Sequence, residues 1–418
     1  MASTQHVKSL SFGSAGVDWQ ERINFARMRQ ERLVKFQNAM KKYGLAAVLL
    51  SKPDSIRYTT AVKGPLFVLG LRYTLVFAEH APIIYELGDT LEQNRVNCPW
   101  IKPENWRYSY CWLNGIGGPG AVADETKKFA DAIKRDLKDK GLDKEKLGFD
   151  VIDEPGRHAL SEAGIELVTA MPAMMEARRT KTKDEIDCTR MACTISDIAW
   201  STVCETLKTG IRENELAAEA LAALMRAGAE MVITGVTSGP NCYELSHLSN
   251  KDRIIELGDL VYMNLCGTSY MGYQVCYYRT FIVGRKPNDK EKDWNKRCYE
   301  RIYSVIGEIK PGATTADAVN HFLPASTWGY EAEQRLLVAE IGHGIGLSAY
   351  EPPVIQRVWS LDHPQPFEKG MIIAVESREG EPFVGGVRLE EMVVVTDTGC
   401  EVITRWPCKE LIAVNIIT

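Results

Sequence analysis

The sequence predicts an α+β protein with two domains, in which an α/β N-terminal domain precedes a larger α+β domain. Short apolar strands alternate with helices up to about Met175, which is typical of strands layered against helices. Beyond that point two long helices come first and strand-rich sequence follows, and this segregation is typical of α+β folds. The chain has 418 residues, which is too long for one ordinary domain. We therefore expect a polar arm at 1–22, an N-terminal domain at 23–176 and a C-terminal domain at 184–418.

The N-terminal domain is expected to combine one long helix with several buried strands. Ile23 to Tyr43 has apolar residues at helical spacing, and Gly44 suits the left-handed residue that closes a helix. Compact apolar runs predict buried strands, and a hairpin is expected between Arg72 and Leu87. The other expected elements are a strand at Leu45–Ser51, a charged helix at Ala121–Lys140 and strands at Leu147–Val151 and Ile165–Val168.

The C-terminal domain is expected to begin with two long periodic helices after Asp184. A turn at Lys208-Thr209-Gly210 separates them, because glycine supports the backbone conformation that ends a helix. The elements expected after them are strand-rich sequence from Met231 to Val283, helices at Lys290–Ile309 and Thr314–Trp328, and mostly strand to the end.

Composition excludes several classes of function. The net charge of −5 gives no reason to expect nucleic acid or an anionic membrane as a partner. No apolar stretch approaches the ~20 residues that span a bilayer, and the first twenty residues lack the apolar core of a secretory signal. The eleven cysteines are scattered without a C-x-x-C pair, which favours reduced thiols over a disulfide framework or a structural zinc site. We expect a cytoplasmic protein.

The segment from Gly258 to Phe281 has the frame of a strand pair that carries metal ligands in dinuclear metallohydrolases. Such a site needs two aspartates about eleven residues apart to hold two hard cations through oxygen. Asn264 and Cys276 stand in the corresponding places. An amide oxygen is a weak neutral ligand, and a thiolate is too soft for Mn²⁺ or Mg²⁺. A dinuclear site is therefore not expected.

Three further motifs lie around this strand pair in a fixed order. They are SGPNCYELSHLSNKDRIIELGDL with His247, EIGHGIGLSAYEPP with His343, and KGMIIAVES followed by GGVRLEEMVVVT, with Glu376 and Glu390. Together with Y-x-G-Y and R-T-F, these motifs resemble the methionine aminopeptidase, prolidase and creatinase superfamily. The resemblance implies a "pita-bread" C-terminal domain, and the N-terminal domain fits the prolidase and creatinase branch.

The resemblance also implies which residues correspond to the metal ligands of the family, which are two Asp, one His and two Glu. His343, Glu376 and Glu390 match the last three, whereas Asn264 and Cys276 replace the two aspartates. One extra residue separates Asn264 from the Y-x-G-Y match. With two carboxylates replaced, the expected metal content is none.

The creatinase branch has the most similar pattern, because it also has Asn at the first aspartate position and works without metal. The main prediction is therefore a metal-independent hydrolase that cleaves a C–N bond of a small guanidino, amidino or amide substrate. His247 would shuttle a proton from water to the leaving nitrogen. Glu376 and Glu390 would face each other without metal and bind a cationic group of the substrate. His343 completes the expected catalytic set.

The expected substrate-binding residues come from both domains. They are Arg72, Asn264, Cys276, Tyr350 and Arg388. Tyr350 stands where prolidases carry a second histidine, and it is either a donor to a developing oxyanion or a packed aromatic. In creatinase a comparable arginine reaches the neighbouring subunit and holds the substrate carboxylate. Arg72 would do the same in a homodimer, or it is an ordinary exposed arginine.

Three alternatives remain open at this stage. One zinc or iron ion held by Cys276, His343, Glu376 and Glu390 would support Xaa-Pro-type peptidase or lyase chemistry. Cys276 would otherwise be a nucleophile with a histidine as base. A non-catalytic binding protein on the same scaffold is the third alternative, although the long acidic tail and large extra domain of such relatives are missing from this sequence.

Overall fold

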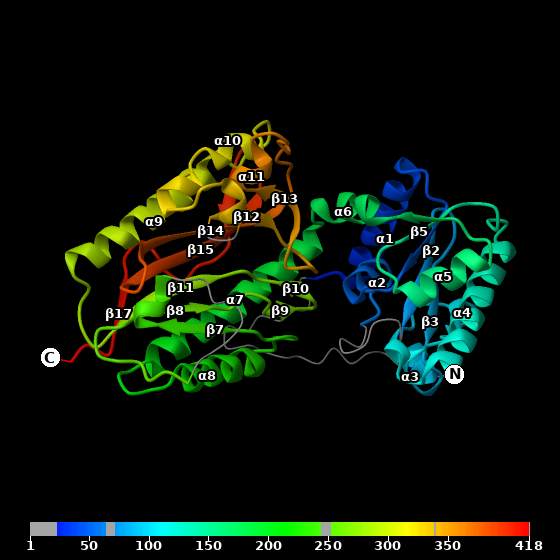
Figure 1. The fold of residues 1–418 in the computed structure, drawn as a ribbon, viewed down its shortest axis with the longest axis horizontal. Coiled ribbons are helices and arrows are strands. Elements are labelled where there is room, and N and C mark those ends of the chain that lie inside the picture. Colours follow the sequence, from blue (N-terminus) through cyan, green and yellow to red (C-terminus); the bar gives the residue numbers. More distant parts are fainter. Residues whose placement is uncertain (1–22, 64–71, 244–251, 338–339, 418) are drawn as a thin grey trace. The chain divides into compact units, whose positions relative to one another are not determined.

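The computed structural model describes residues 23–63, 72–243, 252–337 and 340–417. The chain forms two compact units (Figure 1). The N-terminal unit comprises Arg29–Thr180 with the short segment Tyr350–Pro352. The C-terminal unit comprises Lys181–Ala349, the chain from Pro353 onward and the described residues up to Met28.

The N-terminal unit is built on one mixed six-stranded sheet with the order β4-β3-β2-β1-β5-β6. The predicted hairpin is confirmed, because β2 pairs antiparallel with β3 as well as with β1. Strand β5 pairs parallel with β1 and with β6, and β4 pairs parallel with β3. The strands are β1 Ala47–Leu50, β2 Tyr73–Phe77, β3 Ile83–Glu86, β4 Trp106–Tyr108, β5 Leu147–Phe149 and β6 Leu167–Thr169.

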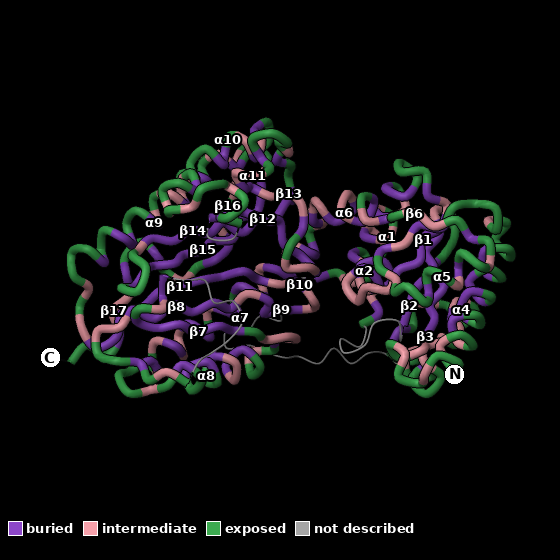
Figure 2. The backbone as a smooth tube through the Cα atoms, in the orientation of Figure 1, coloured by how far each residue is buried: buried purple, intermediate pink, exposed green. Residues whose placement is uncertain are grey.

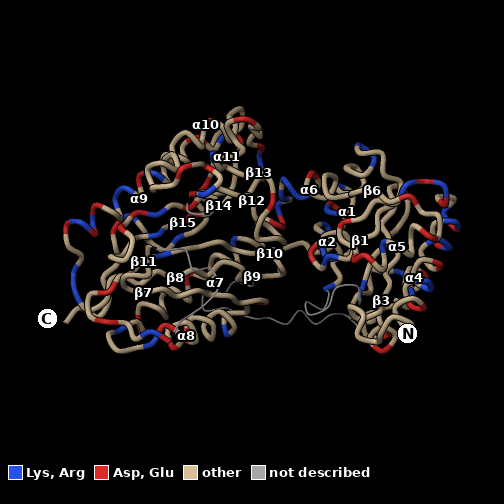
Figure 3. Tube along the Cα trace, viewed as in Figure 1, with Lys and Arg blue, Asp and Glu red and all other residues tan. Residues whose placement is uncertain are grey.

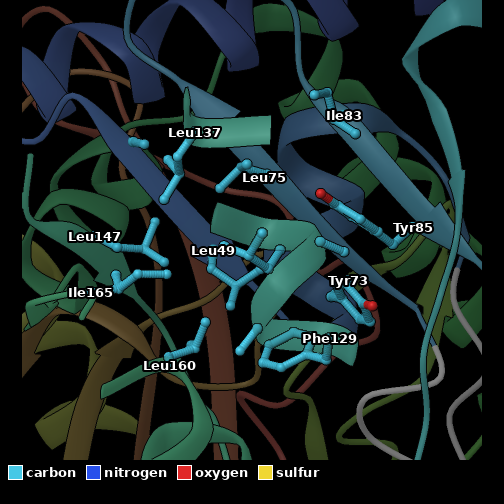
Figure 4. Close-up of a cluster of buried hydrophobic side chains, with 14 of the residues drawn as sticks. Leu49, Tyr73, Leu75, Ile83, Tyr85, Phe129, Leu137, Leu147, Leu160 and Ile165 are labelled. Atoms are coloured by element: carbon cyan, nitrogen blue, oxygen red, sulfur yellow. The ribbon is translucent and has the colours of Figure 1, made fainter. Parts of the chain in front are cut away.

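Helices surround this sheet, and apolar side chains from both form the core of the unit. Figure 4 shows Leu49, Leu75 and Phe129 among these side chains, all buried. Full burial of such a side chain contributes about 1.5–3 kcal/mol. Gly44, which follows the first helix, has φ +67°, as the sequence predicts. The helices are α1 Phe25–Lys42, α2 Pro53–Thr60, α3 Gly88–Asn97, α4 Pro119–Asp139, α5 Glu154–Glu162 and α6 Met171–Arg179, with 3₁₀ turns η2 Pro103–Asn105 and η3 Leu113–Gly115.

The C-terminal unit has two main sheets, with strand orders β17-β11-β8-β7 and β13-β12-β14-β15-β16. Strand β15 contacts both β8 and β11, so the two sheets pack against each other. A small hairpin, β9 with β10, extends from the first sheet. The strands are β7 Gly235–Ser238, β8 Leu260–Asn264, β9 Ser269–Tyr270, β10 Tyr273–Gln274, β11 Tyr278–Val283, β12 Ile341–Gly344, β13 Glu351–Ile355, β14 Ile372–Glu381, β15 Gly385–Val395, β16 Cys400–Val402 and β17 Ile412–Val414.

Helices cover the outer faces of these two sheets. Helix α8 packs on α7 and on β7, and α9 lies along β14 and β15. The central strands are consequently buried on both faces, as Figure 2 shows for β8, β14 and β15. The helices are α7 Lys183–Thr206, α8 Glu213–Arg226, α9 Asp289–Glu308, α10 Thr315–Val319 and α11 Arg357–Ser360, with 3₁₀ turns η4 Gly239–Tyr243, η5 Ala325–Trp328 and η6 Glu333–Arg335.

The predicted α+β class is confirmed, and local signals explain most helix limits. Helix α7 starts at a capping box in which the Thr182 backbone N–H donates to Glu185 (2.8 Å) and the Glu185 N–H donates back to the Thr182 hydroxyl (3.4 Å). The single helix predicted over Thr314–Trp328 is wrong. Helix α10 ends at Val319 and η5 begins after Pro324, because proline lacks the N–H that a continuous helix requires.

Charges do not form single-sign surfaces on the long outer helices. Lys and Arg alternate with Asp and Glu along α4 and α9 (Figure 3). Among the described residues, none of the helices is both long and apolar enough to cross a membrane.

Candidate functional site

Three adjacent strands of the five-stranded sheet each contribute one candidate functional side chain. Glu376 on β14 lies directly opposite Glu390 on β15. His343 on β12 lies opposite Ala374, two residues before Glu376. Since residues i and i+2 of a strand and directly opposed residues share a face, the three polar side chains project from the same face of the sheet.

These three side chains form a compact, buried group. Relative exposure is 1% for His343, 1% for Glu376 and 0% for Glu390. One nitrogen of His343 and one oxygen of each glutamate lie within 4.8 Å of one another. The distance from His343 Nε2 to Glu390 Oε1 is 4.0 Å. A histidine and two carboxylates at this spacing have the ligand types of a metal site. His343, Glu376 and Glu390 are called the triad below.

A hydrogen bond to the backbone orients the His343 ring. Its Nδ1 lies 3.0 Å from the Gly344 carbonyl oxygen. Because a carbonyl can only accept, Nδ1 carries the proton, and in the neutral ring the Nε2 lone pair is directed to the cluster. This is the arrangement by which proteins fix a histidine for metal binding through Nε2.

The two glutamates face each other, and the protein does little to offset the repulsion between their carboxylates. Directly opposed like charges destabilise a sheet, and burial adds a desolvation cost. Burial raises the pKa of Glu376 to about 7, although Arg388 opposes the shift. Burial, with Cys266 and Glu376 nearby, raises the pKa of Glu390 well above its usual value.

The hydrogen-bond capacity of these carboxylates suits a bound cation. Among the described residues, neither oxygen of Glu376 and not Oε1 of Glu390 has a hydrogen bond of good geometry, although Tyr278 partly stabilises the Glu376 carboxylate, and all three atoms are buried. The cation nearest to them in an ion pair is Arg388, whose Nη2 lies 3.7 Å from Glu376 Oε2. Buried carboxylates are normally hydrogen-bonded, paired or bound to metal. The residues present therefore fit a metal ion.

Two cysteines lie beside this triad, and sequence reasoning missed one of them. Cys276 Sγ is 2.7 Å from Cys266 Sγ, and Cys266 Sγ is 3.5 Å from Glu390 Oε2. Both sulfurs and a Glu390 oxygen lie within 4.8 Å of one another. The extra residue before the Y-x-G-Y motif indicates an irregularity in the hairpin, but a shift of one position leads from Asn264 to Leu265 and does not identify Cys266.

A β-bulge explains why Cys266 faces Cys276. Val275 is opposite both Gly267, whose N–H it accepts (2.9 Å), and Thr268, to whose carbonyl it donates (2.9 Å). Gly267 has φ +90°, which glycine adopts without steric cost. Bulges re-aim side chains and are frequent next to active sites. Here the bulge shifts the register so that Cys266 and Cys276 become opposed.

The other predicted residues of the C-terminal unit have different surroundings. Asn264 is buried, lies opposite Tyr278 and donates its amide to the Tyr262 hydroxyl at 3.3 Å. Arg388 is fully buried, and among the described residues its three side-chain nitrogens have no hydrogen-bond partner. Cys276 is part of the cluster. The roles of Asn264 and Arg388 in binding substrate stay predictions.

Two of the remaining predicted residues, Arg72 and Tyr350, belong to the N-terminal unit. Arg72 is buried in the N-terminal unit, where its guanidinium pairs with Glu86 and donates to the Lys63 carbonyl. Binding a substrate carboxylate would require that ion pair to break. Tyr350 is 54% exposed and belongs to the N-terminal unit. His247, the predicted proton shuttle, lies outside the described residues.

Comparison with known proteins relates this chain to peptidases. The model of metallopeptidase family M24 matches residues 187–397. The Xaa-Pro dipeptidase of Pyrococcus furiosus is 28% identical over 90% of this chain and 97% of its own. The prolidase structure from Pyrococcus horikoshii OT3 superposes with a TM-score of 0.72 at 25% identity, covering 91% of this chain and 100% of its own. A creatinase of a Bacillus species is 28% identical over 67% of this chain and 71% of its own.

These likenesses confirm some predictions and correct others. The pita-bread fold and the prediction of a hydrolase that acts on C–N bonds are confirmed. The prediction of a metal-independent, creatinase-like reaction is wrong, because the matching family consists of metallopeptidases and the relatives matched over nearly the whole chain include Xaa-Pro dipeptidases. The expectation of no metal cofactor is wrong for the same reason. It gave too much weight to Asn264 and Cys276 and did not include Cys266.

Proposed function

Because the chain belongs to metallopeptidase family M24, we propose that it is a metal-dependent peptidase that hydrolyses the Xaa-Pro bond of dipeptides. The single observation that supports this most strongly is the buried triad of His343, Glu376 and Glu390. The protein supplies too few hydrogen-bond donors and cations to stabilise its two carboxylates. The similarity to Xaa-Pro dipeptidases over 90% of the chain supports the substrate class.

In this proposal the triad holds a divalent metal ion. A divalent ion bound there would supply Lewis-acid polarisation of a peptide carbonyl and activation of a water molecule. His343 would bind through Nε2, since the Gly344 carbonyl holds the proton on Nδ1. Glu376 retains its proton up to a pH of about 7 in the metal-free protein, so ion binding must displace that proton.

Arg388 is the residue that we propose for binding the substrate carboxylate. Arg388 lies on strand β15, two residues before Glu390. Its Nη2 lies 3.7 Å from Glu376 Oε2. A guanidinium with unused donors next to the cluster suits bidentate binding of a carboxylate. In a free Xaa-Pro dipeptide the carboxylate belongs to the proline that directly follows the bond to be cleaved. Binding that carboxylate beside the cluster would therefore select dipeptides over longer peptides.

The proposal is tested by activity on matched substrates. Protein loaded separately with Zn²⁺, Co²⁺ or Mn²⁺ is assayed with an Xaa-Pro dipeptide, the same dipeptide amidated at its C-terminus, and creatine. We expect the free dipeptide to be cleaved, chelation to abolish cleavage, and amidation to raise KM. Arg388→Lys is expected to raise KM for the free dipeptide by at least about tenfold, because one hydrogen bond to a charged group is worth about 1.5–3 kcal/mol.

Specific outcomes would contradict this proposal. Activity that survives complete removal of metal would exclude the triad as a metal site. Cleavage of creatine but not of the dipeptide would exclude the peptidase. An Arg388→Lys variant with a lower kcat and an unchanged KM would exclude carboxylate binding by Arg388. The same conclusion would follow if amidation of the substrate raised the KM of the variant as much as it raises the KM of the native protein.

We also propose that the enzyme is a cytoplasmic homodimer. All eleven cysteines are free, which is consistent with a reducing compartment. The dimer rests on the resemblance to creatinase and prolidase. Light scattering coupled to size exclusion is expected to give twice the mass of one chain, and a monomer mass at micromolar concentration would contradict the dimer.

A further inference from the structure

A second group of donor atoms shares Glu390 with the triad. It consists of Cys266, Cys276 and Glu390, whose donor atoms lie within 4.8 Å of one another. Cys276 is 5% exposed and Cys266 is half-buried. Glu390 is thus a member of two donor groups, one with His343 and Glu376 and one with the two thiols. A carboxylate has two oxygens and can bridge two neighbouring ions.

We propose that Cys266, Cys276 and Glu390 form a second metal subsite, which selects a thiophilic divalent ion of the zinc class over Mn²⁺ or Mg²⁺. The inference rests on the proposed function, which places a metal on the His343 side of the same cluster. Thiolates are soft ligands that favour zinc, whereas Mg²⁺ and Mn²⁺ prefer carboxylate and carbonyl oxygens. On binding, each thiol loses its proton to solvent and its sulfur donates an electron pair to the ion.

The geometry separates these two cysteines from Cys242 and Cys298, which are buried in the same unit, and the thiol of Cys408 contacts a different carboxylate, that of Glu391, at 2.9 Å. Buried cysteine most often behaves as a small apolar side chain. The Cys242 thiol donates to the carbonyls of Thr237 and Leu260 at 2.9 Å, and the Cys298 thiol donates to the Ser377 carbonyl at 3.2 Å. Those thiols are satisfied by the backbone. Cys266 and Cys276 instead approach each other and a carboxylate.

Two further observations favour a ligand here. Glu390 Oε2 lies 3.5 Å from Cys266 Sγ, whereas its buried Oε1 lies 4.0 Å from His343 Nε2 and has no hydrogen-bond partner among the described residues, so the carboxylate presents one oxygen to each donor group. The bulge at Gly267, where Val275 faces two residues, is what brings Cys266 opposite Cys276. Two thiolates and two carboxylates would supply four negative charges, which equals the charge of two divalent ions. The two cysteines therefore supply the negative charge that Asn264 lacks, through ligands that favour a different metal.

The proposal is tested by the spectrum of the cobalt-loaded protein. Metal-stripped, reduced full-length protein is titrated with Co²⁺ under anaerobic conditions, and bound cobalt is measured by elemental mass spectrometry. We expect a near-ultraviolet thiolate-to-cobalt charge-transfer band in the native protein. The band should weaken in Cys266→Ser and disappear in the Cys266→Ser/Cys276→Ser variant. Cys298→Ser is the matched control, because it alters a buried cysteine outside the cluster and should leave the band unchanged.

A metal competition provides the second readout. Native protein is expected to retain Zn²⁺ in the presence of excess Mn²⁺. The Kd for Zn²⁺ at the weaker site should rise by at least about a hundredfold in the double variant. Loss of a residue that only hydrogen-bonds to a metal ligand already lowers metal affinity about ten- to a hundredfold. Replacement by aspartates, C266D/C276D, should reverse the preference toward Mn²⁺.

The outcomes separate this inference from the proposed function. Bound cobalt without a charge-transfer band, together with cleavage of Xaa-Pro dipeptides, would overturn the thiol subsite and leave the peptidase intact. A band that persists in the double variant would also overturn it. A thiol-dependent band in a protein that cleaves no dipeptide would support the subsite and contradict the peptidase. A Cys266–Cys276 disulfide in freshly reduced protein, with no metal taken up, would overturn the subsite.

Discussion

Replacement of Glu376 by glutamine is expected to lower kcat/KM by at least about a thousandfold, because a metal ion supplies several kcal/mol of transition-state stabilisation and each factor of ten corresponds to about 1.4 kcal/mol. Glutamine preserves the volume of the side chain at this fully buried position on β14. It removes the charge that an ion in the triad requires. Steady-state kinetics and bound metal per chain, measured on the same preparation, check this prediction.

The matched control lies on the same strand. Glu381→Gln alters an exposed glutamate that pairs with Lys290 at 2.7 Å, and it should change neither metal content nor kcat/KM. A Glu376→Gln protein that binds less metal but melts at or above the temperature of the metal-free native protein would support a functional role. If both metal content and activity stay native, Glu376 is not a ligand.

Replacement of Arg279 by methionine is expected to lower the free energy of unfolding of the C-terminal unit by about 3–5 kcal/mol, as breaking a buried ion pair typically does. Arg279 is 1% exposed and binds Glu391 at 3.0 Å. Its guanidinium also donates to the carbonyl oxygens of Tyr278 (2.7 Å), Glu390 (2.6 Å) and Trp406 (2.6 Å). The substitution leaves the Glu391 carboxylate buried without its cation.

Urea unfolding followed by circular dichroism measures this effect. Lys369→Met is the control, because the Lys369–Asp397 pair is exposed on both sides and such pairs contribute little. Since Arg279 holds the backbone of the proposed ligand Glu390, we also expect weaker metal binding in Arg279→Met. An unfolding midpoint equal to that of the Lys369→Met protein would contradict the stabilising role of the buried network.

The class of the fold and three residues of the candidate site were predictable because they depend on local patterns. Apolar periodicity located α1, α7, α8 and α9 and the strands between them, since burial of one face imposes that periodicity. The motifs around His343, Glu376 and Glu390 identified residues that the sheet then brings into register. The helix predicted through Pro324 failed, because the missing N–H of one proline outweighed the periodicity of its neighbours.

The sequence by itself determined the fold class, the family and the His-Glu-Glu part of the candidate site. Only the tertiary structure decided the rest, namely that Cys266 joins Cys276 and Glu390. The reason is register. A strand has a side-chain period of two, so one bulged residue decides which side chains face each other. The bulge at Gly267 depends on hydrogen bonds with Val275 across the hairpin, and spacing along the chain does not encode that pairing.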